Sequence, residues 1–223
     1  MPDEVKAKRR YESPRRRAQA ESTRAQILAS AGELFERQGY AATTMAAVAE
    51  DAGVALKTVY VAFETKSGLL RALWHLRLRG DQDALAIQDR TWYREVLDEP
   101  DAVGQLHLTA HHSRVVKERV GALFDVIRGA ATSDPDVAAL WSRIESEFHG
   151  LQRTIVESIA AKKALRRRLD VGRAADILWT LNHPDLWRLL VRERGWTPEE
   201  WETWFGDTAI EQLLQPPRLR PRH

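Results

Sequence analysis

Helical periodicity along nearly the whole 223-residue chain is the feature that most limits its fold. Apolar residues recur every three or four positions, the spacing of one face of an α-helix. The sequence lacks sustained alternation of β-branched residues and has no Asn-Gly or Asp-Gly hairpin turn between apolar runs. We therefore expect an all-α protein of about nine helices and no sheet.

Capping and terminating residues predict where these helices begin and end. The expected helices cover residues 22–38, 44–53, 55–63, 66–88, 102–131, 135–161, 171–194 and 198–214. Residues 91–101 are interpreted as a connection, and a break near His112 remains open. Pro184 should kink the helix that contains it, because proline lacks an N–H. Thr197, Pro198 and Glu200 form the capping-box pattern of a helix start.

Bulk composition excludes several classes of protein. About 43% hydrophobic and 30% charged residues describe an ordinary soluble globular chain. No apolar run approaches ~20 residues, so we expect no membrane span. The basic N-terminal segment lacks the apolar stretch of a secretory signal. The absence of cysteine excludes disulfides, thiolate metal sites and a cysteine nucleophile, and it fits a cytoplasmic protein.

The net charge of +2 is small, but its distribution is uneven. Residues 1–24 carry eight Lys or Arg against four acids, whereas residues 25–66 carry three against five. A basic flexible arm over residues 1–21, including Arg15, Arg16 and Arg17, could therefore supply attraction to phosphate. The alternative is a solvated tail, which such charge runs often are.

Residues 52–70, AGVALKTVYVAFETKSGLL, have the spacing of a helix-turn-helix although VYVAF carries few hydrogen-bond donors. At 100° per residue, Val59 and Phe63 share one face, and Val61 and Ala62 occupy the other together with Lys57 and Thr58. A helix in the major groove can use both kinds, since thymine offers a methyl group and lysine reaches guanine or phosphate. A small amphipathic core helix is the alternative for this segment alone.

The wider context decides between these interpretations, because residues 23–72 resemble the N-terminal domain of the TetR (tetracycline-repressor-like) transcriptional regulators. The residues that carry the resemblance are Ala31, Leu34, Phe35, Gly39-Tyr40, Thr43-Thr44, Val48-Ala49, Ala52-Gly53-Val54, Thr58-Val59-Tyr60, Phe63, Lys66 and Leu69-Leu70. The stretch LWTLNHPDLWRLLVRERGWTPEEWETWF also looks like the C-terminal part of many members, more weakly. The resemblance implies a helix-turn-helix domain, here residues 22–66, joined by a long helix to a larger helical ligand-binding and dimerisation domain, residues 67–214, before a tail at 215–223.

The resemblance also implies which residues meet DNA. Phosphate contacts would come from Thr44, Tyr60, Lys66 and the amides that begin the next helix. Base edges would be faced by Leu56, Lys57, Val61 and Ala62, with Thr58 at the margin. Ala46, Ala55 and Gly68 depart from the family pattern. These departures predict few hydrogen bonds to bases and a readout that depends on thymine methyl groups, Lys57 and DNA shape.

For the larger domain, the resemblance implies a ligand pocket and a dimer interface formed by the last two helices. The expected pocket lining is Trp74, His75, Leu78, Phe124, Ile127, Trp141, Phe148, Trp179 and Asn182. The expected interface is Leu178, Leu181, Leu186, Leu189, Leu190, Trp201, Phe205, Ile210 and Leu213. Ordinary core packing is the alternative for each of these residues. All eight tryptophans lie at or beyond Trp74, which also separates the chain into two working parts.

No glycine-rich phosphate loop, nucleophile elbow or paired-carboxylate motif occurs, so we expect no enzymatic activity and no cofactor. His107 and His111 have a metal-compatible spacing but no fitting carboxylate, and we expect no metal site. The function that fits best is a repressor that binds a palindromic operator as a homodimer and is released by a small apolar or aromatic effector. A transcriptional activator, a constitutive architectural DNA-binding protein and an all-α enzyme remain alternatives.

Overall fold

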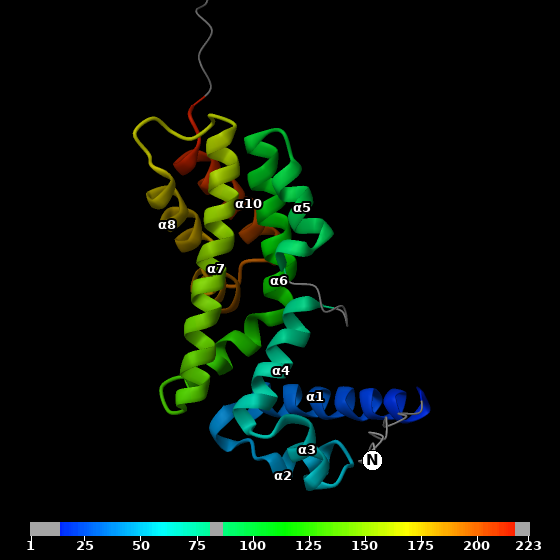
Figure 1. Ribbon diagram of the computed structural model, residues 1–223. Coiled ribbons are helices and arrows are strands. Elements are labelled where there is room, and N and C mark those ends of the chain that lie inside the picture. The colour runs from blue at the N-terminus through cyan, green and yellow to red at the C-terminus, as the bar shows by residue number, and fades with distance from the viewer. Residues whose placement is uncertain (1–13, 81–86, 217–223) are drawn as a thin grey trace, which may run out of the picture. The chain divides into compact units, whose positions relative to one another are not determined.

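The computed structural model describes residues 14–80 and 87–216. The chain divides into two compact units, Met1–Ala72 and Leu73–His223, so the division falls inside the fourth helix (Figure 1). The predicted all-α class is confirmed: over the described ranges the only β-type pairing is one isolated bridge between Leu165 and Leu214. No described helix combines the length and apolarity that crossing a bilayer would require.

The first unit contains α1 (Pro14–Ala42), α2 (Met45–Asp51), α3 (Leu56–Phe63) and the start of α4 (Lys66–Arg79). Its core is built from one stripe of each helix: Ile27, Ala31, Leu34, Phe35, Val48, Ala49, Val59, Phe63, Leu69 and Leu70. These residues recur at three- and four-residue intervals, so burial against neighbouring helices is what stabilises such short elements.

The beginning of α1 differs from the sequence prediction. The helix starts at Pro14 and not at Ser22, so Arg15, Arg16 and Arg17 lie exposed on its first turns. Proline is favoured at the first helical position, and the Arg17–Glu21 ion pair (2.9 Å) connects successive turns there. The part of the predicted flexible arm from residue 14 onward is therefore helical, and residues 1–13 lie outside the described residues. At the other end Gly39 interrupts the helical dihedrals (φ 79°), as its predicted role as a stop requires.

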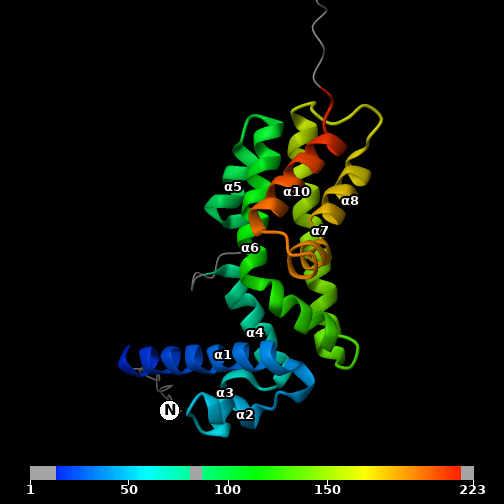
Figure 2. The same ribbon diagram turned by 180° about the vertical axis from the view of Figure 1, so that it is seen from behind.

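The second unit consists of η1 (Ile87–Asp89), α5 (Thr91–Asp98), α6 (Ala102–Ala130), α7 (Pro135–Ala161), α8 (Val171–Leu181), α9 (Pro184–Trp187), a π-helical segment η2 (Arg188–Glu193) and α10 (Pro198–Leu213). The long helices α6 and α7 lie side by side, α8 packs on α7, and α10 packs on α6 and α8 (Figures 1 and 2). The predicted capping box of Thr197 and Glu200 is present at the start of α10.

Two expectations for this unit were wrong at the level of single elements. Residues 91–98, expected as a connection, form α5, because Tyr93 and Val96 are buried at helical spacing and the chain turns only before Pro100. Helix α4 ends at Arg79 and not near Gln88, because Gly80 adopts a positive φ of 72° that terminates the helix. No break occurs near His112, since α6 is continuous from Ala102 to Ala130.

Pro184 divides the predicted helix 171–194 and does not merely kink it. Helix α8 ends at Leu181, and Pro184 occupies the first turn of α9, where its missing N–H leaves no bond unmade. The His183 side chain caps the new helix by accepting a hydrogen bond from the Asp185 N–H (3.2 Å). The chain therefore changes direction at residues 182–183, which places Asn182 at the interior end of α8.

Candidate functional site

Helix α3 has an inner face that is buried and an outer face that is exposed. Val59 and Phe63 are buried, whereas Leu56, Tyr60 and Val61 are 42%, 48% and 76% exposed. Arg24 holds the C-terminal end of the helix, because its Nη1 donates to the Ala62 carbonyl (2.8 Å) and its guanidinium lies 4.3 Å from the Phe63 ring centre. Exposed valine, leucine and tyrosine side by side are unusual for a solvated surface and indicate a contact surface.

The turn before α3 gives the pair α2–α3 its helix-turn-helix geometry. Gly53 adopts a positive φ of 65°, a conformation that disfavours other residues, and the Val54 N–H donates to the Ala49 carbonyl (2.9 Å). Thr44 caps α2 by accepting from the Ala47 N–H (3.0 Å) and stays exposed, so its hydroxyl proton remains available to a phosphate. Lys57 is exposed on the outer face of α3, with Thr58 and Ala62 partly buried at its sides.

Lys66 is placed differently from the expectation that it mainly serves phosphate. Its ammonium donates to the carbonyls of Tyr40 (2.9 Å) and Thr43 (3.1 Å) and lies 4.1 Å from the centre of the Tyr40 ring. The Tyr40 carbonyl belongs to the last turn of α1 and the Thr43 carbonyl follows it, so the ammonium binds at the C-terminal end of this helix, where cations are favoured. Lys66 therefore connects α4 to the end of α1, and one of its three N–H donors at most is left for a phosphate.

Gly68→Ala is expected to destabilise the first unit by about 1–3 kcal/mol. A Cβ at Gly68 would lie 2.3 Å from the Phe63 carbonyl oxygen, so the backbone of α3 or α4 would have to shift. Gly68 was interpreted as a departure that weakens base contacts, and its close approach to Phe63 supplies a packing reason instead.

Urea unfolding followed by circular dichroism measures the change in stability of Gly68→Ala. Gly129→Ala on α6, where a Cβ meets nothing within 4 Å, is the control and should be neutral or stabilising. Equal stability of Gly68→Ala and wild type would contradict the prediction.

The second unit contains a cavity of about 820 Å³. Its walls are largely apolar and aromatic, with contributions from Trp74, Leu78, Trp92, Val96, Val116, Val120, Phe124, Ile144, Phe148, Leu151 and Ile155. Helices α4, α5, α6 and α7 and the end of α8 all contribute to the lining. Such a volume with mainly apolar walls and a few polar groups is typical of small-molecule sites.

Six of the nine predicted lining residues lie on this cavity: Trp74, His75, Leu78, Phe124, Phe148 and Asn182. Ile127 is instead fully buried in the core. Trp141 packs edge-on against Phe124 (4.7 Å between ring centres), and Trp179 packs against His183 (5.0 Å). Helical spacing identifies the inward face of a helix, but it does not separate residues that face a cavity from residues that fill the core beside it.

A polar cluster on the cavity wall was not predicted from the sequence. Asn182 donates through Nδ2 to Ser113 Oγ (2.9 Å) and to Gln152 Oε1 (3.2 Å), and its Oδ1 accepts from Lys117 Nζ (2.5 Å). All four residues line the cavity. A signal was available, because Lys117 falls within the stripe of α6 that carries the apolar residues Leu106, Ala110, Val120 and Phe124, where a charged residue is unexpected.

Nearby titratable groups respond to the same burial. Burial lowers the pKa of His112, and the neighbouring His111 lowers it further. Burial also raises the pKa of the Tyr93 phenol, whose hydroxyl donates to the Leu151 carbonyl (3.0 Å). His112 and Tyr93 therefore favour their neutral forms in this cavity.

Four residues of the predicted dimer interface belong to the core of a single chain. Leu178, Trp201, Phe205 and Leu213 are 0% exposed. Trp201, Phe205 and Leu213 lie on α10, which packs on α6 and α8, and Leu178 lies on α8, so helices of the same chain already cover all four side chains. Leu189 is exposed, and Leu181, Leu186, Leu190 and Ile210 are partly buried. An apolar stripe predicts that a helix face is buried, but it does not show whether the same chain or a partner chain covers that face.

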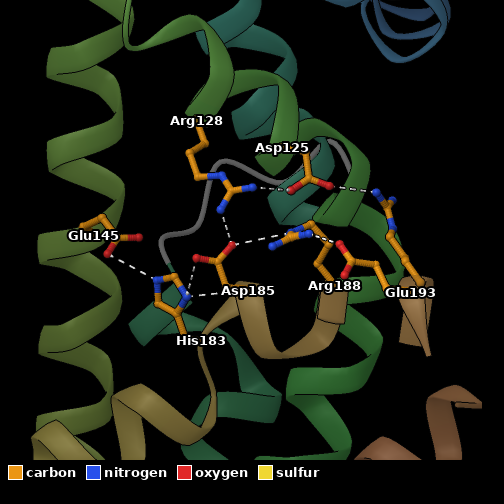
Figure 3. A network of polar contacts seen from close by, with 8 residues as sticks. Asp125, Arg128, Glu145, His183, Asp185, Arg188 and Glu193 are labelled. Atoms are coloured by element: carbon orange, nitrogen blue, oxygen red, sulfur yellow. Dashed lines mark hydrogen bonds and ion pairs between the residues drawn. The ribbon is translucent and has the colours of Figure 1, made fainter. Parts of the chain in front are cut away.

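His183 and Asp185 belong to a charged network that secures the break at Pro184 (Figure 3). Asp185 accepts a hydrogen bond from Arg128 and lies 3.7 Å from Arg188 Nε, and His183 Nε2 lies 3.5 Å from Glu145. These contacts join α6, α7, α9 and η2. They explain why the sequence places charged residues on both sides of the proline.

The two histidines with metal-compatible spacing point to different partners. His111 Nδ1 lies 3.3 Å from Glu202, whereas the His107 ring lies against Gly206. Among the described residues no group of three His, Cys, Asp or Glu side chains could hold a metal ion.

Comparisons with known proteins agree with these features. The family model "Bacterial regulatory proteins, tetR family" matches residues 27–73. The probable HTH-type transcriptional regulator ArpR of Pseudomonas putida is 28% identical over 212 residues, which covers 92% of this chain and 98% of that protein. NalD of Pseudomonas aeruginosa, described as the secondary repressor of the MexAB-OprM multidrug efflux pump, has 20% identity and a TM-score of 0.67, covering 88% of this chain and 98% of its own. A Saccharomonospora viridis protein solved in complex with choline has 15% identity and a TM-score of 0.67, covering 88% and 100%.

The first unit has the helix-turn-helix arrangement that many DNA-binding proteins use, and a larger helical unit follows it. Residues 27–73 thus match the TetR-family model, and over almost its full length the chain is similar to HTH-type transcriptional regulators, which are transcription factors and not enzymes.

Proposed function

We propose that the protein is a repressor that binds a palindromic operator as a homodimer and is released by a small apolar or aromatic effector. The observation that carries the proposal is the pairing of two features in one chain. Helix α3 exposes an apolar face with Lys57, and the second unit encloses a cavity of about 820 Å³. NalD's description as a repressor supports the sign of the regulation, and the choline complex supports ligand binding within this fold.

The cavity also argues against a constitutive DNA-binding protein. A domain that served only to hold two recognition helices together would gain stability from filling that volume, because empty space forfeits packing contacts. The effector would act through α4, since Trp74 and His75 line the cavity and continue the helix that begins at Lys66. The effector would change the distance between the two α3 helices of the dimer. These helices would then no longer fit half-sites about one helical turn apart, and operator affinity would fall.

Footprinting on genomic DNA tests this function directly. The purified protein should protect a palindromic site of two half-sites, with a stoichiometry of one dimer, and protection should be lost when an effector occupies the cavity. Protection that persists with a ligand bound in the cavity would exclude release by an effector. Failure to protect any site would exclude the proposed function.

Lys57→Ala is expected to weaken operator binding about 10- to 100-fold and to relax base preference at one position of each half-site. Lys57 is exposed on the outer face of α3 and is the lysine on that helix, so no neighbouring cation replaces it there. Titration of labelled operators with single base changes measures both effects. Lys163→Ala, an exposed lysine in the second unit, is the matched control and should leave affinity unchanged. If Lys57→Ala kept wild-type affinity and preference, Lys57 would not read bases.

A further inference from the structure

Among the described residues Lys117 is the one buried lysine, and it lines the cavity. Its side chain extends from α6 and is 5% exposed. The ammonium donates to Asn182 Oδ1 (2.5 Å) and lies 4.7 Å from the centre of the Trp201 ring and 5.8 Å from that of Phe148. An amide oxygen and two aromatic faces all favour a positive charge at Nζ.

No carboxylate compensates this group. Among the described residues Lys117 forms no ion pair, although buried lysines are ordinarily paired. Burial lowers its pKa from 10.5 to about 7. The surroundings of Lys117 Nζ therefore favour a cation through one hydrogen bond and two aromatic rings, but they supply no negative charge.

Two arginines, Arg79 and Arg90, share the cavity lining with Lys117. Among the residues described, Glu147 is the one carboxylate of this lining. Glu147 lies exposed on α7, so its charge is largely hydrated. A neutral or cationic molecule would leave the Lys117 ammonium without an anion, whereas one acidic group would complement it.

The cluster around Lys117 is also arranged to hold an anion. The Nδ2 of Asn182 donates to Ser113 and Gln152, which fixes its Oδ1 toward Lys117. Ser113 accepts through its oxygen and keeps a hydroxyl proton that can donate to a ligand. Charge-assisted bonds from an ammonium are stronger than neutral ones, so one such contact would orient an otherwise apolar molecule.

We propose that the effector is an aromatic or otherwise apolar molecule with one acidic group, and that Lys117 binds this group as an anion beside Ser113 and Asn182. The inference rests on the proposed function as a ligand-responsive regulator, and it names the chemical class of the effector. The ring system lies against the apolar walls, and the carboxylate or phenolate supplies the missing negative charge.

Matched ligand pairs test the proposal. Calorimetric titration of the full chain without DNA compares 2-naphthoate with 2-naphthamide, and biphenyl-4-carboxylate with biphenyl-4-carboxamide. We expect each acid to bind about tenfold or more tightly than its amide. Lys117→Met should lose this preference, whereas Lys163→Met, an exposed control outside the cavity, should keep it. Equal affinity of acid and amide for wild type would overturn the proposal, and so would failure of both acids to bind.

A pH series on wild type keeps the test independent of how well the variant folds. Acid binding requires protonated Lys117, so affinity for the acids should fall between pH 6 and 9 while affinity for the amides changes little. Titratable groups that share the cavity are His75, Arg79, Arg90, Tyr93, His112 and Glu147. Burial lowers the pKa of His112, so this histidine does not account for a fall that continues toward pH 9. A flat profile for the acids would contradict the assignment.

The result also separates the inference from the proposed function. If acid and amide bind equally and both release operator DNA, the effector class is wrong and the regulator remains. If the acids bind through Lys117 and no operator release follows, the site is real and the regulatory role is wrong.

Discussion

Lys117→Met should make the protein more stable at pH 6, by about 1–4 kcal/mol, and this advantage should shrink as the pH rises toward 9. Methionine fills a similar volume without a charge, so the variant avoids burying an unpaired ammonium. A pKa displaced from 10.5 to about 7 sets an upper limit of about 5 kcal/mol on the change. Loss of the hydrogen bond to Asn182 Oδ1 opposes the gain.

The direction follows from proton binding. Between pH 7 and 10.5 the unfolded chain holds a proton on Lys117 that the folded chain has released, so wild-type unfolding free energy rises with pH in this window. Below pH 7 both states are protonated, and wild type pays the full burial penalty. The difference between variant and wild type isolates this group, because all other titrating residues are shared.

Denaturant unfolding of both proteins at half-unit pH steps measures the difference. A stability difference that stays constant from pH 6 to 9 would contradict a buried, unpaired Lys117. Lys163→Met, at an exposed position, should follow the wild-type profile throughout.

Trp201→Ala should lower the unfolding free energy by about 3–5 kcal/mol, the cost of emptying a large core position. Trp201 is 0% exposed, stacks on Phe205 with 5.1 Å between ring centres, and meets Trp187 edge-on at 5.0 Å. Its loss would also remove the aromatic face nearest Lys117. Thermal and urea unfolding measure the effect.

Trp204→Ala is the matched control, because Trp204 lies one turn away on α10 and is only partly buried. It should cost clearly less than Trp201→Ala, since removing a side chain that is already partly exposed leaves a smaller void. The comparison also separates core from interface. A variant that lost dimerisation but kept the stability of its monomer would show that Trp201 faces a partner chain, contrary to its burial here.

Local signals were sufficient to predict the cap, the turn and the two faces of the helix-turn-helix in the first unit, although not where α1 begins. Thr44 as a cap, Gly53 as a turn and the division of α3 into a buried Val59–Phe63 face and an exposed Val61 face all depend on residues close in sequence. Capping and helical spacing are short-range properties, and the structure confirms them at these positions. The role of Val61 and Lys57 in reading bases stays a prediction.

Long-range partners account for what the sequence did not reveal. Lys66 could reach in several directions, and only the fold shows that two carbonyls near the end of α1 accept its protons. Leu178 and Trp201 have an interface-like pattern, but other helices of the same chain cover them, and only the assembled fold shows this. The cavity is a space between helices, so the sequence does not show that Gln152 and Ser113 line it. This becomes visible only once α6, α7 and α8 are packed together.

The placement of every tryptophan in the second unit, with Trp74 and Trp92 on the cavity wall, gives the molecule a built-in optical reporter for one half only. Its indole emission should respond to a ligand in the cavity and to melting of the second unit. The first unit, whose described aromatic residues are Phe35, Tyr40, Tyr60 and Phe63, is silent at indole wavelengths. Independent unfolding of the two units would therefore register as a fluorescence transition that does not coincide with loss of helical ellipticity.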